Sequence, residues 1–86
     1  MPELVVYSRR GCHLCEDLLA ELEPLLRGQA DLRVVDIDSD PRLAAAWGTR
    51  IPVVMGGGDL LCEARLDRAA LFAWLRGCRA SRPGDR

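Results

Sequence analysis

Two cysteines separated by two residues, in Cys12-His13-Leu14-Cys15, are the side chains of this chain best suited to chemistry. A thiolate is both a nucleophile and a metal ligand, and a C-x-x-C setting can lower a cysteine pKa from about 8.5 to roughly 3.5–7.5. The apolar run before the pair, residues 4–7, predicts a short strand, and the leucines after it recur at the three- and four-residue spacing of an amphipathic helix. The unpaired N–H groups and positive dipole end of such a helix favour a thiolate at its start. We therefore expect Cys12 to attack and Cys15 to resolve.

Strands and helices are expected to alternate along the rest of the chain. The predicted strands are residues 4–7, 32–37, 51–55 and 60–62. The predicted helices follow Cys12, run from Pro41 to Gly48 and follow Asp67. Pro24 predicts a kink in the first helix or an end of its regular part near Glu23. Gly56-Gly57-Gly58-Asp59 predicts a tight hairpin turn. The order β-α-β-α-β-β-α predicts an α/β fold with a small mixed sheet and helices on both faces.

Length and composition indicate one small globular domain. The chain has 86 residues, of which 49% are hydrophobic and 29% are charged, and its net charge is −1. All 12 basic residues are arginines, so only Arg9, Arg10 and His13 could supply a cation beside the dithiol in sequence. We expect a single domain over residues 1–80, a flexible tail over residues 81–86 and a monomer.

Several functional classes are disfavoured by the sequence. No basic cluster is dense enough for nucleic-acid binding, and no segment approaches the roughly 20 apolar residues of a membrane span. Met1-Pro2-Glu3 leads directly into the first strand without the pattern of a signal peptide, so we expect a cytoplasmic location. In a reducing compartment, C-x-x-C beside a βαβ pattern indicates redox catalysis or metal binding rather than a disulfide framework.

Three segments of the chain resemble the thioredoxin superfamily, and most closely small bacterial glutaredoxin-like proteins with a C-H-L-C centre. Residues 7–15 are similar to the glutaredoxin active-site run, in which an aromatic residue precedes a turn and C-x-x-C. Residues 35–41 are similar to the second strand and the following helix entry, and residues 48–53 to the segment whose Ile-Pro or Val-Pro bond is cis throughout that family. The resemblance covers roughly residues 4–76, by the element count above.

The resemblance implies a thioredoxin-like fold with a four-stranded mixed sheet, and a function in thiol–disulfide exchange. Cys12 would be the nucleophile, Cys15 the resolving thiol, and cis Pro52 would shape the edge that binds the substrate. The expected substrate-binding residues are Tyr7, Arg10, His13, Arg50, Ile51 and Pro52. No cofactor or metal is expected, although glutathione is a candidate co-substrate, and the expected partners are protein or low-molecular-weight thiols and disulfides.

The chain departs from the families that it resembles. Thioredoxins carry a buried Asp in the strand before the active site, where this chain has Val6. Glutathione-using glutaredoxins carry a Gly-Gly pair and an Asp after the fourth strand, where this chain has Glu63-Ala64-Arg65-Leu66-Asp67. The departures argue for thiol exchange without the usual carboxylate-binding loop for glutathione.

Other interpretations of the same residues remain open. Cys12, His13 and Cys15 could ligate a metal or an iron–sulfur cluster, although a closed zinc site needs four ligands and neither Cys62 nor Cys78 belongs to a second C-x-x-C pair. The chain could also be an interaction module whose redox chemistry is dormant. The flanking residues have structural alternatives as well. His13 could be an exposed first-turn residue, Arg9, Arg10 and Arg50 could be solvated surface charges, and Tyr7 could be a half-buried strand residue.

Overall fold

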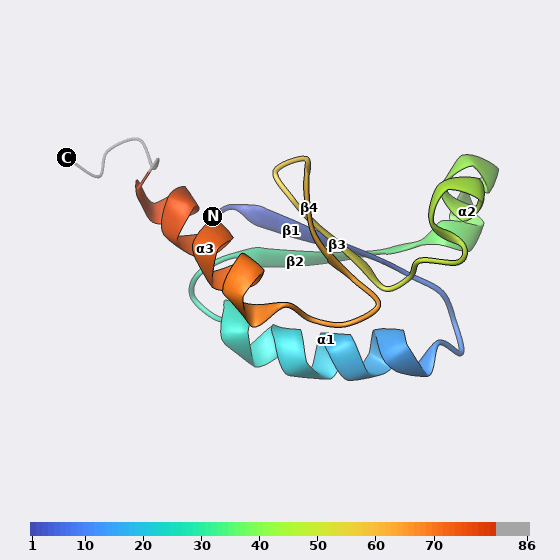
Figure 1. Ribbon diagram of the computed structural model, residues 1–86, viewed down its shortest axis with the longest axis horizontal. Coiled ribbons are helices and arrows are strands. Elements are labelled where there is room, and N and C mark those ends of the chain that lie inside the picture. The colour runs from blue at the N-terminus through green and yellow to red at the C-terminus, as the bar shows by residue number, and fades with distance from the viewer. Residues whose placement is uncertain (81–86) are drawn as a thin grey trace.

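The computed structural model describes residues 1–80, so the tail expected over residues 81–86 lies outside the described residues. These residues form a four-stranded sheet with the strand order β2-β1-β3-β4 and three α-helices (Figure 1). The elements in chain order are β1 (Glu3–Ser8), α1 (His13–Leu26), β2 (Asp31–Asp36), the short 3₁₀ helix η1 (Ile37–Ser39), α2 (Pro41–Trp47), β3 (Val53–Gly56), β4 (Asp59–Glu63) and α3 (Arg68–Ala80). β1 pairs with β2 in parallel and with β3 antiparallel, and β4 closes a hairpin with β3. The predicted fold class is confirmed.

The two faces of the sheet are covered differently, because alternate residues of a strand point to opposite sides. Leu4 and Val6 of β1 are fully buried on the face shared by α1 and α3, where the main core lies. The core residues are Leu4, Val6, Leu18, Leu22, Leu26, Ala30, Val54, Leu71 and Leu75. Tyr7 points to the other face and stacks on Trp47 of α2, with ring centroids 5.7 Å apart. Helices therefore pack on both faces, as predicted.

The first helix does not end early at its proline. α1 continues through Pro24 to Leu26, and Gly28 follows in a left-handed conformation with φ of 74°. A proline removes one helical N–H and leaves the carbonyl four residues earlier without its partner. Pro24 and Ala20 are both exposed, so water can satisfy that carbonyl. The alternative of a helix end near Glu23 was wrong.

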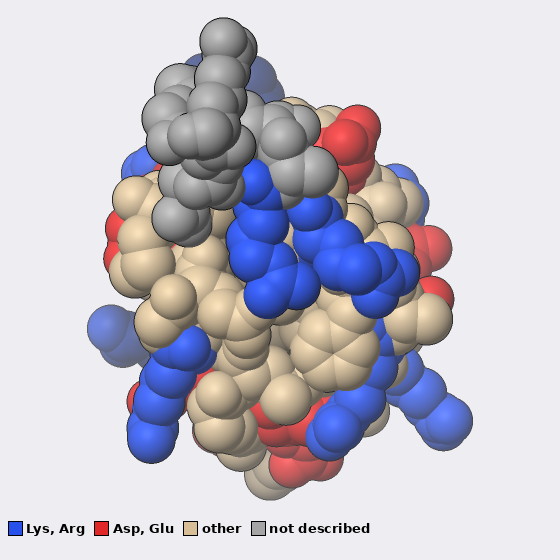
Figure 2. Space-filling model, turned by 90° about the vertical axis from the view of Figure 1, so that its left-hand side faces the viewer, with Lys and Arg blue, Asp and Glu red and all other residues tan. Residues whose placement is uncertain are grey.

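One edge of the sheet gathers the loops that flank the predicted site. β1 and β2 both end there, and the pairing of Tyr7 with Val53 shows that β3 begins at the same edge. The loop before α1, the η1 segment and the Ile51–Pro52 turn therefore lie together at this edge, beside α2 (Figure 1). The opposite end, around the N-terminus and α3, presents arginines interspersed with uncharged and acidic surface (Figure 2). Within residues 1–80, no helix is long and apolar enough to cross a membrane.

Candidate active site

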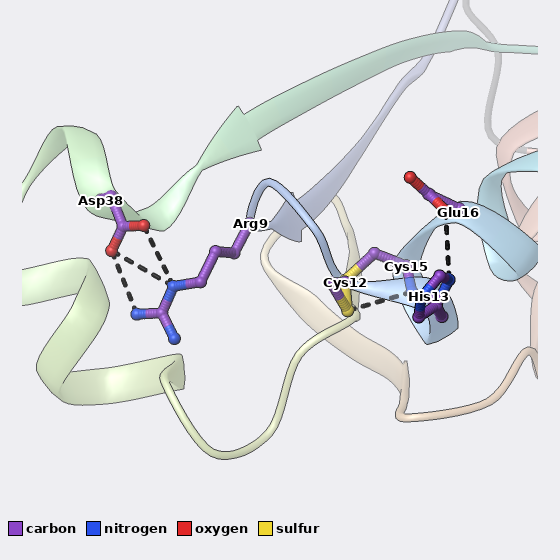
Figure 3. The surroundings of a disulfide bond; sticks show 6 residues. All are labelled: Arg9, Cys12, His13, Cys15, Glu16 and Asp38. Atoms are coloured by element: carbon purple, nitrogen blue, oxygen red, sulfur yellow. Dashed lines mark hydrogen bonds and ion pairs between the residues drawn. A yellow bond between two sulfur atoms is a disulfide. The ribbon is translucent and has the colours of Figure 1, made fainter.

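Cys12 and Cys15 are joined as a disulfide at the start of α1, with their Cα atoms 5.2 Å apart (Figure 3). Cys12 is the N-cap residue of the helix, and its Sγ accepts a hydrogen bond from the Cys15 backbone N–H at 3.1 Å. Gly11, with φ of 76°, allows the sharp turn that brings the chain from β1 into this cap. The sequence thus places the first sulfur at the helix N-terminus, as predicted.

The two sulfurs have different surroundings. Cys12 is half-buried at the protein surface, whereas Cys15 is only 1% exposed and faces the core. Because an N–H donor and a helix N-terminus favour negative charge, the thiolate is favoured at Cys12. Burial without a cation favours the neutral thiol at Cys15. The two sulfurs of the pair therefore differ in their access to solvent and in their hydrogen bonding.

The three arginines near the site differ in their availability to a substrate. Arg9 makes a bidentate ion pair with Asp38, with contacts of 3.0 to 3.3 Å. Arg50 donates to Glu63 at 2.6 Å and lies over the Trp47 ring, 4.8 Å from its centroid. Within the described part of the chain, Arg10 is exposed and takes part in none of the ion pairs. Of the two arginines predicted to bind substrate, Arg10 and Arg50, Arg10 is therefore the one whose side chain is free to contact a substrate.

Tyr7 and Arg50 belong to a layer that joins β1, α2, β4 and the loop after α2. Tyr7 of β1 stacks on Trp47 of α2, Arg50 lies over the Trp47 ring, and Glu63 of β4 accepts from the guanidinium. Trp47 and Glu63 were not among the predicted site residues, and their roles depend on contacts between segments distant in sequence. This layer positions the Ile51–Pro52 turn.

The Ile51–Pro52 peptide bond is cis, as the resemblance implied. Pro52 is fully buried, and its carbonyl accepts from the Ala64 N–H at 2.8 Å, which extends the β3–β4 pairing by one bond. The Ile51 N–H already donates to the Trp47 carbonyl at 3.1 Å. The Ile51 N–H is therefore not free to donate to a substrate strand that pairs with this turn.

The histidine within the dithiol motif points away from both sulfurs. The His13 side chain is 94% exposed and its Nδ1 lies 3.6 Å from Glu16 (Figure 3). A neighbouring carboxylate opposes any help that a protonated histidine would give to a thiolate. His13 lies at the site but occupies the position of an exposed first-turn residue.

A groove of about 300 Å³ runs between α1 and the segment from β4 to α3. Its lining is formed by Leu14, Asp17, Leu18, Glu21, Ala64, Arg65 and Leu66. Leu14, between the two cysteines, is 53% exposed. The groove lies beside the dithiol and offers apolar surface with both signs of charge to a substrate.

The other two cysteines lie away from the dithiol, and both are free and half-buried. Burial raises the pKa of the Cys62 thiol above its ordinary value. Among residues 1–80, no three His, Cys, Asp or Glu side chains gather in an arrangement able to hold a metal ion. Cys62 therefore acts as a small apolar residue packed against the core.

The Cys62 environment gives a pH-dependent prediction. In reduced protein at pH 7, we expect iodoacetamide to label Cys12 at least about ten-fold faster than Cys62, because only the thiolate reacts. The unfolded Cys62 thiol ionises near its ordinary pKa of about 8.5 and the folded thiol ionises higher, so stability should fall as pH rises above that value. Peptide mass spectrometry and urea unfolding measure the two effects, and Cys62→Ala should remove the second. Equal labelling of the two cysteines would contradict the prediction.

Comparison with known proteins agrees with this geometry. The family model described as Glutaredoxin-like domain (DUF836) matches residues 3–76. The solution structure of protein Ne2328 from Nitrosomonas europaea is 36% identical, with a TM-score of 0.76 over 86% of this chain and 92% of that chain. The X-ray structure of protein XcR50 from X. campestris is 37% identical, with a TM-score of 0.67 over 86% of this chain and 96% of that chain.

A more distant neighbour and the curated proteins complete the comparison. A mutant thioredoxin from Halobacterium salinarum is 26% identical, with a TM-score of 0.58 over 87% of this chain and 72% of that chain. No curated protein matches the chain. The family match spans most of the chain, including the dithiol and the cis proline. The chain therefore belongs to the glutaredoxin-like branch of the thioredoxin superfamily.

Proposed function

We propose that this protein is a thiol–disulfide oxidoreductase with Cys12 as nucleophile and Cys15 as resolving thiol. The observation that carries the proposal is the asymmetry of the dithiol, in which the Cys15 N–H contacts Cys12 Sγ at 3.1 Å while the Cys15 side chain is buried. A half-buried thiolate at a helix N-terminus is the form that attacks disulfides. Membership of the glutaredoxin-like family supports the same chemistry.

The reaction proceeds in two exchanges and moves two electrons. The Cys12 thiolate attacks one sulfur of a substrate disulfide, which forms a mixed disulfide and releases the other sulfur as a thiolate that takes a proton from water. Cys15 then loses its proton to solvent and attacks the Cys12 sulfur. This step forms the Cys12–Cys15 disulfide and releases the second substrate thiol. An external thiol must reduce the protein again, which a reducing compartment such as the cytoplasm supplies.

Two surfaces beside the dithiol support a substrate that is a protein or a low-molecular-weight disulfide. Arg10 lines a hollow of about 340 Å³ at the ends of β1 and β2 and would attract an anionic partner. The groove beside Leu14 would accept an apolar side chain next to a substrate cysteine. Both surfaces come from one chain, so a monomer is sufficient for the proposed reaction.

Trapping with Cys15→Ser tests the proposal. Without the resolving thiol, the mixed disulfide on Cys12 should persist, so mild oxidation in a cell extract should leave protein or glutathione adducts that dithiothreitol releases. The matched control is the double variant with Cys12→Ser and Cys15→Ser, which should trap nothing. Mass spectrometry of non-reduced samples identifies the adducts. Absence of any adduct, or a visible absorption band of a cluster in freshly purified protein, would contradict the proposal.

A further inference from the structure

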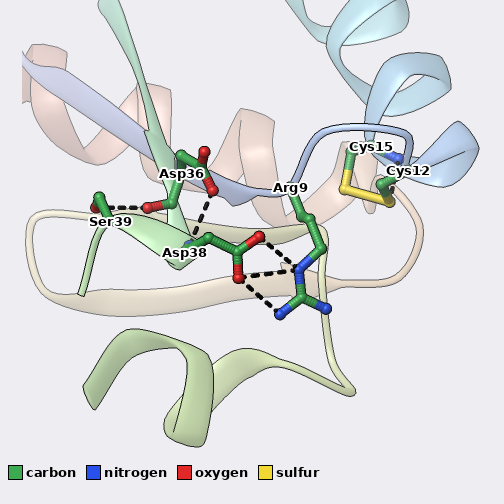
Figure 4. Close-up of polar contacts among 6 residues, drawn as sticks. All are labelled: Arg9, Cys12, Cys15, Asp36, Asp38 and Ser39. Carbon is green, nitrogen blue, oxygen red and sulfur yellow. Dashed lines mark hydrogen bonds and ion pairs between the residues drawn. A yellow bond between two sulfur atoms is a disulfide. The ribbon is translucent and has the colours of Figure 1, made fainter. Parts of the chain in front are cut away.

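Arg9 connects the turn that carries Cys12 to η1, using its backbone carbonyl for one contact and its guanidinium for the other. Its backbone carbonyl accepts a hydrogen bond from the Cys12 N–H at 3.3 Å. Its guanidinium binds Asp38 with Nε at 3.0 Å and 3.3 Å from the two carboxylate oxygens and Nη2 at 3.0 Å from one of them (Figure 4). Arg9 is therefore held at one end by η1 and itself holds the turn that carries Cys12.

The Asp38 end of this link is fixed independently of Arg9. The Asp38 N–H donates to the Asp36 carboxylate at 2.9 Å, and the Ser39 hydroxyl donates to the Asp36 carbonyl at 2.6 Å (Figure 4). Ile37, between them, is fully buried. These contacts hold η1 in place. The ion pair therefore fixes the turn that carries Cys12 to a well-ordered part of the fold.

The pair is poorly placed to act by charge alone. The Arg9 side chain points away from the disulfide toward Asp38 (Figure 3), and the carboxylate neutralises the guanidinium. The two side chains are 38% and 53% exposed, a setting in which ion pairs contribute little to the free energy of unfolding. A bidentate arginine–carboxylate pair fixes geometry more strictly than a single contact does.

We propose that Arg9 and Asp38 are a positioning pair that holds the Cys12 turn so that its sulfur remains within reach of the Cys15 N–H. The proposal rests on the proposed function, because it assigns the pair to keeping the nucleophile in its thiolate form. When the pair is broken, the turn should move more freely and the N–H contact to Cys12 Sγ should be made for less of the time. The thiolate fraction of Cys12 should then fall.

Three variants separate positioning from charge. Arg9→Met removes the charge and the pair, Arg9→Lys keeps the charge but loses the bidentate fork, and Asp38→Ala leaves Arg9 as an unpaired cation. Positioning predicts that all three lower the rate of Cys12 alkylation by iodoacetamide, by about three- to ten-fold for Arg9→Met and Asp38→Ala, measured in reduced protein below the Cys12 pKa. A charge effect predicts no change for Arg9→Lys and faster alkylation for Asp38→Ala. That pattern, or wild-type rates in all three, would overturn the proposal.

Two controls keep the result interpretable. Arg42→Met removes an arginine that pairs with Asp40 at 3.4 Å on α2, and it should alkylate at the wild-type rate. Urea unfolding of each variant should give a midpoint near that of the wild type, and slow alkylation accompanied by loss of folding in every variant would reject a positioning role. Iodoacetamide is neutral and is not a disulfide, so this readout can fail or succeed independently of the Cys15→Ser trapping that tests thiol exchange.

Discussion

Replacing Cys12 with serine should abolish disulfide reduction by this protein, with a loss of at least about a thousand-fold, as expected when the nucleophile of a catalytic unit is removed. Both proposed exchanges form or break a bond at Cys12 Sγ, and a serine hydroxyl is not ionised at neutral pH. The measurement is a single turnover in which reduced protein is mixed with hydroxyethyl disulfide and quenched samples are analysed by mass spectrometry. Hydroxyethyl disulfide is uncharged, so the surrounding arginines do not bias the rate.

The other cysteines supply the comparison for this prediction. Cys62→Ala and Cys78→Ala should react within about two-fold of the wild type, because neither thiol belongs to the disulfide. Cys15→Ser should retain the first exchange, since the hydrogen bond to Cys12 Sγ comes from the backbone N–H that serine keeps. Loss of the first exchange in Cys15→Ser together with its survival in Cys12→Ser would reverse the two roles.

The features of the fold that local sequence determines were predictable. The leucine spacing after the dithiol, Pro41 and Asp67 identified the starts of three helices. The last two helices are capped by hydrogen bonds from Arg42 N–H to Asp40 and from Ala70 N–H to Asp67. Capping depends on a few neighbouring residues, so a single sequence contains the required information. The same holds for the position of the dithiol at the start of α1.

The partners of charged residues were not predictable in the same way. Asp36 and Asp40 cap the helices that follow them, η1 and α2. Asp38 instead binds Arg9, which is 29 residues away in sequence. Such a pair exists only because parallel strands end at the same edge of the sheet. Arg50, expected to face substrate, likewise meets Trp47 and Glu63 through the arrangement of α2 and β4.

Gly56 shows how a local signal can be assigned to the wrong cause. The run Gly56-Gly57-Gly58-Asp59 predicted a turn, and Gly57 and Gly58 do form it, with φ of 57° and 90°. Gly56 is instead the last residue of β3, opposite Asp59, and its φ is not positive. Its lack of a side chain is explained by Trp74 of α3, since a Cβ built there would lie 2.5 to 2.9 Å from the indole ring. A glycine inside a strand often marks such a close approach.

Gly56→Ala should therefore destabilise the protein by about 1–3 kcal/mol, the usual cost of overpacking a core that cannot expand. Gly77→Ala is the matched control, because a Cβ there meets nothing within 4 Å and α3 should gain about 0.5–1 kcal/mol from the better helix former. Urea unfolding measures both, and the same chemical change should give opposite signs. A Trp74→Leu background should recover part of the Gly56→Ala loss, since the clash is with the indole itself. Equal effects at the two glycines would contradict the prediction, because they would mean that the Trp74 indole moves away from an added Cβ at no cost.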